Sequence, residues 1–412
     1  MSPPQIHSKR RGTGDVTWTK KPLAEVADFS LGKMLDAKQN RGVMRPYLAN
    51  VNVRWGEFIL DDLREMRFES DEMNRYGLKY GDIVMCEGGE PGRSAIWKEP
   101  VPGMMIQKAL HRIRPHDCVE YRFLYYSLMH KTDAGHLASL FTGSTIKHLP
   151  REKLAKVEVQ FPSRAVQVRI SDILSAYDDL IENNTRRIQV LKDMAKTILQ
   201  SATADSWSLI PISGLYEELF DGPHATPKPS TSGPIYLGIK NVTERGELDL
   251  TDIRHIADED FPQWTRRVLP RPGDIVFTYE ATLNRYGIIS RGFRGCLGRR
   301  MALIRPDEKR IDPYLFLHCL LSDQWRDEVR SKTISGATVD RIPLTTFPTF
   351  QVRVPGPDIR ARIGPPIRAC EELAENCRRR NDLLRTTRDL LLPKLVSGEI
   401  PIEAAELTEQ LA

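Results

Sequence analysis

The segment Ser163–Gln200 has the hydrophobic pattern of a long helix with a narrow apolar stripe. Apolar residues recur at steps of three and four, give way to polar residues at Asn184 and Arg187, and return at Leu191. This period is typical of a coiled-coil seam with a polar interruption. Because so narrow a stripe cannot stabilise a lone helix in water, we expect this segment to pair with a second helix.

The same pattern occurs a second time near the C-terminus. Gly143–Pro150 matches Gly336–Pro343 at an offset of 193 residues (336 − 143), and the match continues without a gap through the long segment, where Arg187 falls on Arg380. An ungapped match indicates two copies of one unit. We therefore expect the two helices to pair with each other, although two unrelated surface helices are the alternative. Pro365–Pro366 predict that the second helix begins there, because proline breaks a helix but suits its first turn.

The segment before the first long helix is also duplicated. From Trp18 to Pro162 the chain consists of short strand-like runs and turns, which is typical of an α+β domain. Its framework returns in the second half, where Tyr236–Val242 resembles Tyr47–Val53 and Gly273–Phe277 resembles Gly81–Met85. The stretches between these framework positions differ, which suits a protein that reads two different things with one scaffold. The expected organisation is a tail at 1–17, a domain at 18–162, a helix at 163–200, a domain at 201–355, a helix at 356–400 and a tail at 401–412.

Composition narrows the class of protein only a little. The net charge of +5 permits nucleic-acid binding without requiring it. Six scattered cysteines form no CxxC pair, so neither a zinc site nor a disulfide framework is indicated. No apolar run reaches the length of a transmembrane helix, and we expect a cytoplasmic protein without a membrane contact.

The search for an active site finds no catalytic or cofactor motif. Ile311–Tyr314 resembles the Asp/Asn-Pro-Pro-Tyr motif of adenine methyltransferases but lacks one proline, and a helix that opens with Asp-Pro explains it better. Pro306–Lys309 compresses pieces of a nuclease signature into four residues, which indicates a turn. The histidines show no metal-ligand spacing. We therefore predict no catalytic residue, no metal site and no cofactor.

Basic and amide residues in the divergent loops are the remaining candidates for function. Arginine and lysine suit guanine edges and phosphates, and asparagine suits adenine. A single residue of this kind is more often a solvated surface group. These residues are candidates only because they lie in the divergent loops of a duplicated scaffold. Asn52 and Asn241 match between the copies, so a structural turn is at least as good an explanation for them. The candidates are Arg45, Asn50, Asn52, Arg54, Arg93, Gln107, Lys108, Lys147, Lys240, Asn241, Arg245, Asn284, Arg285, Arg299 and Arg300.

Several of these stretches together resemble a known family. Leu391–Ile400 is similar to the C-terminal signature of the specificity (S) subunits of type I restriction–modification systems. Gly143–Pro150, with Ile173–Ile181, resembles the central conserved region of that family, and Glu87–Arg93 resembles a common loop of its target-recognition domains. The likeness covers residues 18–400 in the order of the family.

The resemblance implies a fold, a function and partners. Each lobe is then a target-recognition domain that docks on one half of a bipartite site in double-stranded DNA. The two long helices pair antiparallel with pseudo-twofold symmetry as a spacer, and they bind two modification (M) subunits with adenine-N6 methyltransferase activity, to which restriction (R) subunits add ATP-dependent cleavage. We expect an apolar flank formed by Ile181, Ile188 and Ala195 to contact the modification subunits. The alternatives are a targeting subunit of a methylation-only complex, a fused enzyme, or a two-lobed scaffold with no role on nucleic acid.

Overall fold

The computed structural model describes residues 17–34, 36, 40–202, 207–336, 339–400 and 402. The tails expected at 1–17 and 401–412 therefore lie almost entirely outside the described residues. The described chain forms two compact units. Unit 1 runs to Ile181 and resumes at Asp382, and unit 2 spans Glu182–Asn381. Each unit thus contains one mixed lobe and one half of each long helix.

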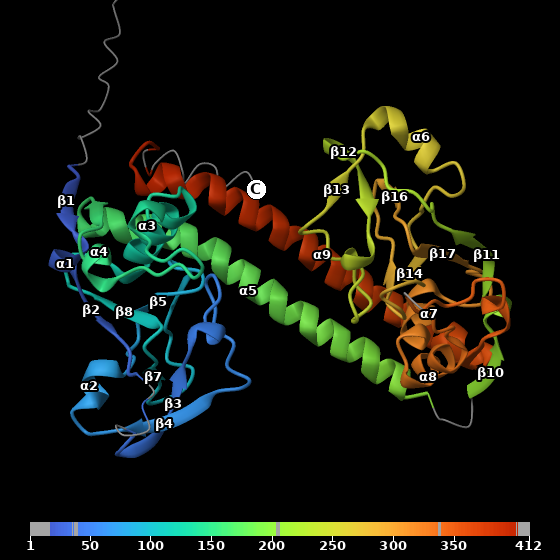
Figure 1. Cartoon of the computed structure of the whole chain (residues 1–412), viewed down its shortest axis with the longest axis horizontal. Coiled ribbons are helices and arrows are strands. Elements are labelled where there is room, and N and C mark those ends of the chain that lie inside the picture. The colour runs from blue at the N-terminus through green and yellow to red at the C-terminus, as the bar shows by residue number, and fades with distance from the viewer. Residues whose placement is uncertain are drawn as a thin grey trace, which may run out of the picture. The chain divides into compact units, whose positions relative to one another are not determined.

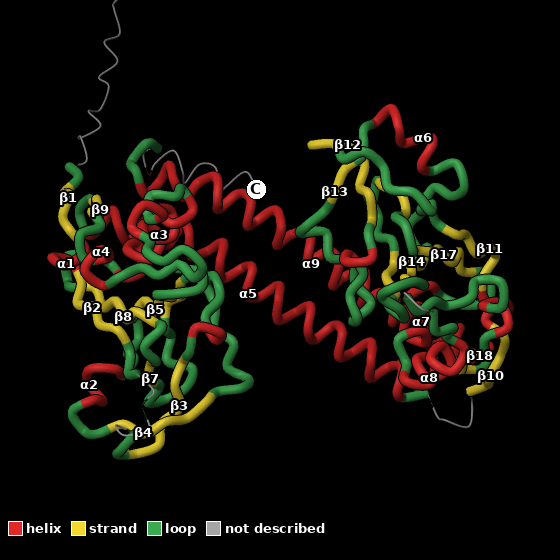
Figure 2. The backbone as a smooth tube through the Cα atoms, viewed as in Figure 1, coloured by secondary structure: helices red, strands yellow, loops and turns green. Residues whose placement is uncertain are grey.

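The lobe of unit 1 is built on small sheets (Figures 1 and 2). Its four-stranded antiparallel sheet has the order β2 (Ala27–Leu31), β8 (Leu110–Pro115), β5 (Ile83–Cys86) and β6 (Ser94–Ile96). A second sheet has the order β4 (Arg64–Phe68), β3 (Val43–Leu48) and β7 (Met105–Ile106), and β1 (Thr19–Pro22) pairs with β9 (Glu158–Phe161). The helices of the lobe are α1 (Leu23–Val26), α2 (Glu72–Tyr76), α3 (Tyr121–Asp133) and α4 (Arg151–Leu154), with 3-10 turns η1 (Asn50–Asn52) and η2 (Ala138–Leu140).

The lobe of unit 2 repeats this topology strand for strand. Its four-stranded sheet has the order β11 (Tyr216–Asp221), β17 (Met301–Pro306), β14 (Ile275–Thr278) and β15 (Tyr286–Ile288). Its second sheet has the order β13 (Arg254–His255), β12 (Ser230–Leu237) and β16 (Gly295–Leu297), and β10 (Trp207–Pro211) pairs with β18 (Gln351–Pro355). The helices are α6 (Phe261–Trp264), α7 (Pro313–Leu320) and α8 (Asp323–Lys332), with 3-10 turns η4 (Ile212–Leu215), η5 (Ile239–Asn241), η6 (Asp258–Asp260) and η7 (Phe347–Thr349). The duplicated α+β scaffold predicted from the sequence is confirmed.

The two long helices are α5 (Arg164–Gln200) and α9 (Pro357–Val396). The first agrees with the predicted segment, but the prediction that α9 begins at Pro365–Pro366 is wrong. Packing overrides the two prolines, because Ile363 and Ile367 on either side of them are buried in the core of unit 2. Gly364 contributes as well: without a side chain it crowds the following proline less, and a Cβ there would lie 2.9 Å from Cβ of Asp312.

Halves of the long helices pack together within each unit. In unit 1, Ile173 and Leu174 of α5 share a core with Leu392 and Leu395 of α9. In unit 2, the α5 residue Ala195 shares a core with Ile363 and Cys370 of α9. Because early residues of α5 meet late residues of α9, and late residues of α5 meet early ones, the helices are antiparallel, as predicted.

The polar interruption of the stripe is a buried contact in unit 2. The side-chain amide of Asn184 donates to Oδ1 of Asn381 at 2.9 Å, and both residues are buried. A buried amide pair fixes the register of two helices, because any slip would leave polar groups without partners.

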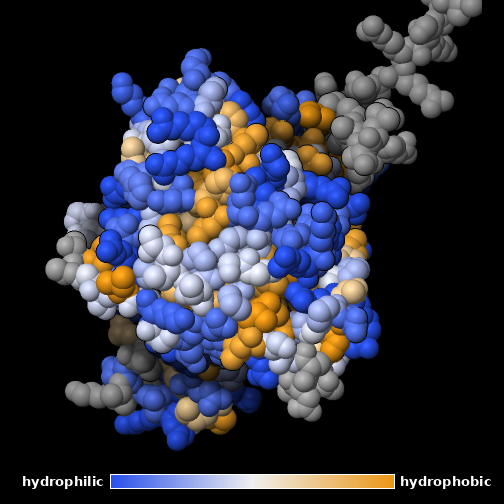
Figure 3. Space-filling view, turned by 90° about the vertical axis from the view of Figure 1, so that its right-hand side faces the viewer, coloured by the Kyte–Doolittle hydropathy of each residue, from blue (hydrophilic) through white to orange (hydrophobic). Residues whose placement is uncertain are grey.

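None of the described helices combines the length and the apolar composition needed to cross a bilayer. On the face shown in Figure 3, hydrophobic residues form separate patches among hydrophilic side chains.

Candidate nucleic-acid interface

The candidate site of unit 1 is the tight loop 87–93 between β5 and β6. Its ends are joined by backbone hydrogen bonds from Cys86 to Arg93 (2.8 Å) and from Gly92 to Cys86 (3.1 Å). Gly89 and Gly92 have φ angles of 76° and 98°, a region that favours glycine. A Cβ on Gly92 would also lie 2.6 Å from Cγ2 of Thr132, so the turn fits closely against α3.

A second loop, residues 142–149, is held against the first. Gly89 donates its backbone N–H to the carbonyl of Lys147 at 3.1 Å, and Leu149 donates to the carbonyl of Glu87 at 2.7 Å. His148 Nδ1 lies 2.9 Å from Oε2 of Glu87. The sequence match that first revealed the repeat, Gly143–Pro150, therefore supplies one wall of this site.

The turn η1 closes the site from the other side. The Asn50 amide donates to the carbonyl of Gly88 at 2.7 Å, and Nη2 of Arg93 donates to the carbonyl of Asn50 at 3.1 Å. Arg93 also bonds Glu90 at 2.7 Å. Trp55, which the sequence did not single out, donates its indole N–H to the same Glu90 at 3.0 Å. The structure thus brings together three predicted residues around one loop, namely Asn50, Arg93 and Lys147. Arg54 lies beside them, since it donates to the carbonyl of Val51 at 2.9 Å.

The loop 279–285 of unit 2 has the same backbone frame. Thr278 bonds the carbonyl of Arg285 at 3.0 Å, which corresponds to the Cys86–Arg93 contact of unit 1. Ala281 donates to the carbonyl of Asp340 at 3.1 Å, and Ile342 donates to the carbonyl of Tyr279 at 2.7 Å. These bonds correspond to those between loop 142–149 and loop 87–93 in unit 1. The φ angles of Ala281 and Asn284 are 67° and 62°, although neither residue is glycine.

Superimposing the two frames by these bonds makes two pairs of predicted residues equivalent. Arg93 corresponds to Arg285 through the backbone bonds from Cys86 and Thr278. Lys108 corresponds to Arg299, because Glu87 donates to the carbonyl of the next residue, Ala109, at 2.8 Å, and Tyr279 donates to the carbonyl of Arg300 at 3.2 Å. Lys108 and Arg299 are both exposed, and only their backbone groups take part in hydrogen bonds among the described residues. Within the described chain, a cation without a side-chain partner therefore lies at the same point of both scaffolds.

The surroundings of the frames differ between the units. In unit 2, Arg285 is bonded to Glu244 at 2.9 Å, and Nε of Arg300 lies 3.5 Å from Oε1 of Glu280. Lys240 is paired with Asp252. Three candidates remain. Arg45 on β3 and Arg245 after η5 are exposed, and their side chains form no hydrogen bond or ion pair with either loop among the described residues. Gln107 is partly buried, and its side-chain oxygen accepts from the N–H of Ala109 at 3.1 Å.

Two candidates are removed from the interface by their hydrogen bonds. Asn52 is buried, accepts from the N–H of Ala49 at 2.9 Å, and donates to the carbonyl of Ile59 at 3.0 Å. Asn241 does the same with Gly238, Asp249 and Asp252. Both amides are committed to holding a turn, so the prediction that they contact DNA is wrong.

One residue of the predicted partner surface is also corrected. Ala195 is fully buried in the core of unit 2, because the lobe covers that side of α5. Ile181 and Ile188 are partly exposed. The strongly exposed apolar residues of α5 in unit 2 are instead Val190 (57%) and Met194 (48%).

The site contains buried polar atoms that have no partner. Oδ1 of Asn50, Nε of Arg93 and Oδ1 of Asn284 are buried and unpaired within the described chain. Such atoms are costly unless something bonds them. No group of three or more possible metal ligands occurs among the described residues. The arrangement offers donors, acceptors and positive charge in paired loops, which suits binding.

The family model described as "Type I restriction modification DNA specificity domain" matches residues 15–193. The chain is 24% identical to the type I restriction enzyme MjaIX specificity subunit of Methanocaldococcus jannaschii, covering 94% of each chain. It is also 24% identical to the EcoBI specificity subunit of Escherichia coli, over 62% of this chain and 60% of that one. The fold is similar to that of the S subunit of a type I system from M. genitalium, with a TM-score of 0.59, 15% identity, and coverage of 93% and 96%.

Proposed function

Because the chain belongs to the specificity subunits of type I restriction–modification systems, we propose that each of its lobes reads one half of an asymmetric, bipartite site in double-stranded DNA. The loop 87–93 with its neighbours reads one half-site, and the loop 279–285 reads the other. The two target-recognition domains of this proposal span 18–162 and 201–355.

The observation that carries the proposal is one backbone frame with two sets of side chains. The frames present a free cation at the same point, Lys108 or Arg299. A cation at a fixed point suits the phosphate backbone, which is the same for every sequence. The groups around the frames differ, with Asn50 and Trp55 in unit 1 and Glu244 and Asn284 in unit 2. Different groups suit different base edges.

In this proposal the chain performs no chemistry itself. It positions two modification subunits, which transfer methyl groups to adenine N6, and restriction subunits, which cleave DNA with ATP. A methylation-only complex remains the second form of the same function. The modification subunits are proposed to dock on the long helices at the exposed Val190 and Met194 and the partly exposed Ile188. We assign the complex to the cytoplasm, because that is where the DNA it reads is found.

The test exchanges one cation at a time. Lys108→Gln and Arg299→Gln each remove a phosphate contact, so each should weaken binding of the assembled complex to its site and reduce the salt slope by about one. Arg330→Gln removes the same charge from α8, where Arg330 is 77% exposed and paired with Asp327, and it serves as the matched control. Affinity is measured by fluorescence anisotropy at several salt concentrations. Equal affinities and slopes for all three variants and the wild type would refute the proposed interface.

A further inference from the structure

Unit 2 contains a cavity of about 920 Å³ beside the first turns of α9. Its walls come from β10, from η4, from the segment between β17 and α7, and from α9 itself. Ile210, Ile311 and Pro365 give it an apolar side. Arginine and lysine side chains supply a cationic side, namely Lys309, Arg310, Arg360 and Arg368. This volume is in the range of sites for small organic ligands, roughly 300–1,000 Å³.

Two of these cations are already neutralised within the protein. Arg368 donates to Asp312 at 2.6 Å and to Glu308 at 2.8 Å. Arg310 pairs with Asp307 at 3.1 Å and donates to the carbonyl of Gly214 at 3.0 Å. These contacts use two of the carboxylates near the cavity, Glu308 and Asp312, and the third that lines it, Glu372, lies 3.9 Å from Arg291.

The other two cations have no partner in the part of the chain that the structure describes. Neither the guanidinium group of Arg360 nor the ammonium group of Lys309 forms a hydrogen bond or an ion pair among the described residues, and Nε of Arg360 is buried. Burial, and then the charge of Arg310, lower the pKa of Arg360, although the group stays charged at neutral pH. Arg360 as a whole is partly buried, but its Nε is a buried donor without a partner, which is costly, so this position calls for an acceptor such as the oxygen of an anion.

The repeat allows the position of Arg360 to be compared with the equivalent position in unit 1. The residue of unit 1 equivalent to Arg360 is Gln167, at the offset of 193. Gln167 is buried and fully used: it accepts from the N–H of Glu120 at 2.8 Å and donates to the carbonyls of Cys118 (3.2 Å) and Pro162 (2.9 Å). In place of this hydrogen-bonded glutamine, unit 2 has a cation at the wall of a cavity that has no partner among the described residues. The difference lies in side chains and not in the fold.

We propose that this cavity binds an organic anion of nucleotide size, whose phosphate or carboxylate group is held by Arg360 and Lys309 and whose apolar body lies against Ile210, Ile311 and Pro365. Arginine suits both head groups, because its planar fork matches either one with two parallel hydrogen bonds. This site does not depend on the proposed DNA interface, since it shares no residue with it.

The test measures binding to the full-length protein by isothermal titration calorimetry. The probes are adenosine monophosphate, 1-naphthoate, adenosine and inorganic phosphate. We expect one or both organic anions to bind with a Kd below about 1 mM, and adenosine and phosphate to bind at least about tenfold more weakly. Tighter binding of adenosine monophosphate indicates a phosphate site, and tighter binding of 1-naphthoate indicates a carboxylate site. Failure of both organic anions to bind, or equal binding of adenosine, overturns the proposal.

Variants locate the site. Arg360→Gln installs the residue that unit 1 carries at this place and should weaken binding of the anion at least tenfold, with Lys309→Gln as a second variant at the exposed edge. Arg330→Gln should have no effect, and all variants should keep the DNA affinity of the wild type. Unchanged anion binding in both Arg360→Gln and Lys309→Gln overturns the proposal. So does a loss that appears instead in Lys108→Gln or Arg299→Gln, because that would place the anion on the DNA interface.

Discussion

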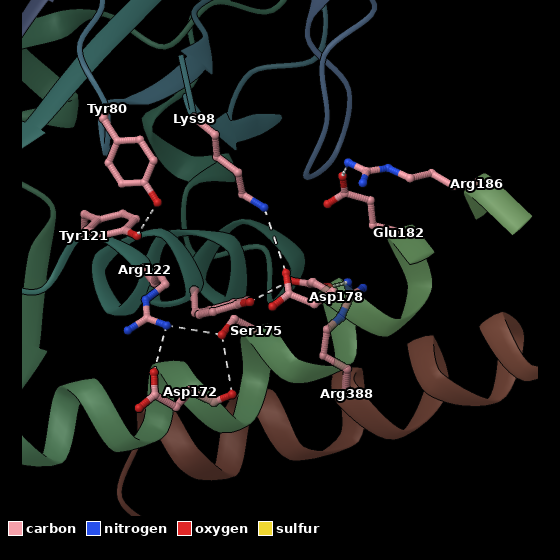
Figure 4. A network of polar contacts seen from close by, with 12 residues as sticks. Tyr80, Lys98, Tyr121, Arg122, Asp172, Ser175, Asp178, Glu182, Arg186 and Arg388 are labelled. Atoms are coloured by element: carbon pink, nitrogen blue, oxygen red, sulfur yellow. Dashed lines mark hydrogen bonds and ion pairs between the residues drawn. The ribbon is translucent and has the colours of Figure 1, made fainter. Parts of the chain in front are cut away.

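Besides the shared core, one carboxylate joins α9 to the lobe of unit 1, that of Asp178 of α5 (Figure 4). Its Oδ2 accepts a hydrogen bond from the hydroxyl of Tyr126 at 2.5 Å, and its Oδ1 pairs with Arg388 of α9. Burial lowers the pKa of Arg388, but the charges of Asp178 and Asp389 outweigh this and hold it above its usual value. Burial and then the charge of Asp178 raise the pKa of Tyr126, so its hydroxyl remains a donor. Lobe, α5 and α9 therefore meet at this carboxylate.

We expect Asp178→Asn to lower the free energy of unfolding of unit 1 by about 2 kcal/mol. Removing one partner from a fully buried ion pair costs about 3–5 kcal/mol. Here the cost is smaller, because the Asp178 side chain is 33% exposed and Arg388 keeps Asp389 as a second partner at 2.8 Å. About 2 kcal/mol corresponds to a fall in Tm of roughly 4–8 °C for a unit of this size.

The neighbouring residue supplies a matched control. Asp179 carries the same group one position along the helix, is 68% exposed, and lies 4.0 Å from Lys98. An exposed pair contributes little, so Asp179→Asn should change the free energy by less than about 0.5 kcal/mol. Urea unfolding followed by circular dichroism gives the free energies, and hydrogen exchange of residues 382–396 reports the release of α9. Equal effects of the two substitutions, or no faster exchange in Asp178→Asn, would show that the carboxylate does not hold α9.

Two further predictions concern pH and partners. His111 is buried and its ring donates to the carbonyl of Leu149 at 2.8 Å, and burial lowers its pKa below 6.5; since the unfolded chain then binds the proton more readily, the stability of unit 1 should fall as pH drops below about 6.5. Urea unfolding at pH 7.5 and 5.5 checks this, and an equally steep fall in His111→Gln would contradict it. Val190→Asp with Met194→Asp should abolish co-purification of the modification subunit without lowering Tm, because both side chains are exposed. Gln189→Asp with Thr197→Asp adds the same charges at polar positions of α5 as the control, and a complex that survives the first pair would count against the helices as the docking surface.

The repeat allowed the fold to be predicted, because an ungapped match transfers topology from one half of the chain to the other. Periodicity correctly gave α5, since its stripe has no strong breaker. It failed at Pro365–Pro366, where burial of Ile363 and Ile367 outweighs two missing N–H groups. It failed again at Ala195, because helical spacing shows which residues share a face but not which face a lobe covers.

The candidate site could be predicted only as a set of residues. Arg93, Asn50 and Lys147 are far apart in sequence, and the hydrogen bonds that join their segments are long-range contacts without a local signal. Asn52 and Asn241 show that the sequence can also place too many residues in the predicted set. Their match between the copies was compatible with base reading and with a turn, and only their paired amides decide for the turn.

The loops themselves explain how one frame can present two surfaces. Gly89 and Gly92 adopt their left-handed conformations at no steric cost, whereas Ala281 and Asn284 hold the same conformations at roughly 1 kcal/mol each. The backbone bonds to Asp340 and Thr278 hold these two residues in place. Unit 2 shows that the same backbone frame can carry a side chain at both positions. In unit 1 the neighbouring α3 requires glycine at one of them, since a Cβ on Gly92 would lie 2.6 Å from Cγ2 of Thr132. The second lobe therefore carries a methyl group at the exposed position, where the first has Gly89, and an amide at the position of the buried Gly92. In the proposed function this difference changes the surface of the loop while the fold stays the same.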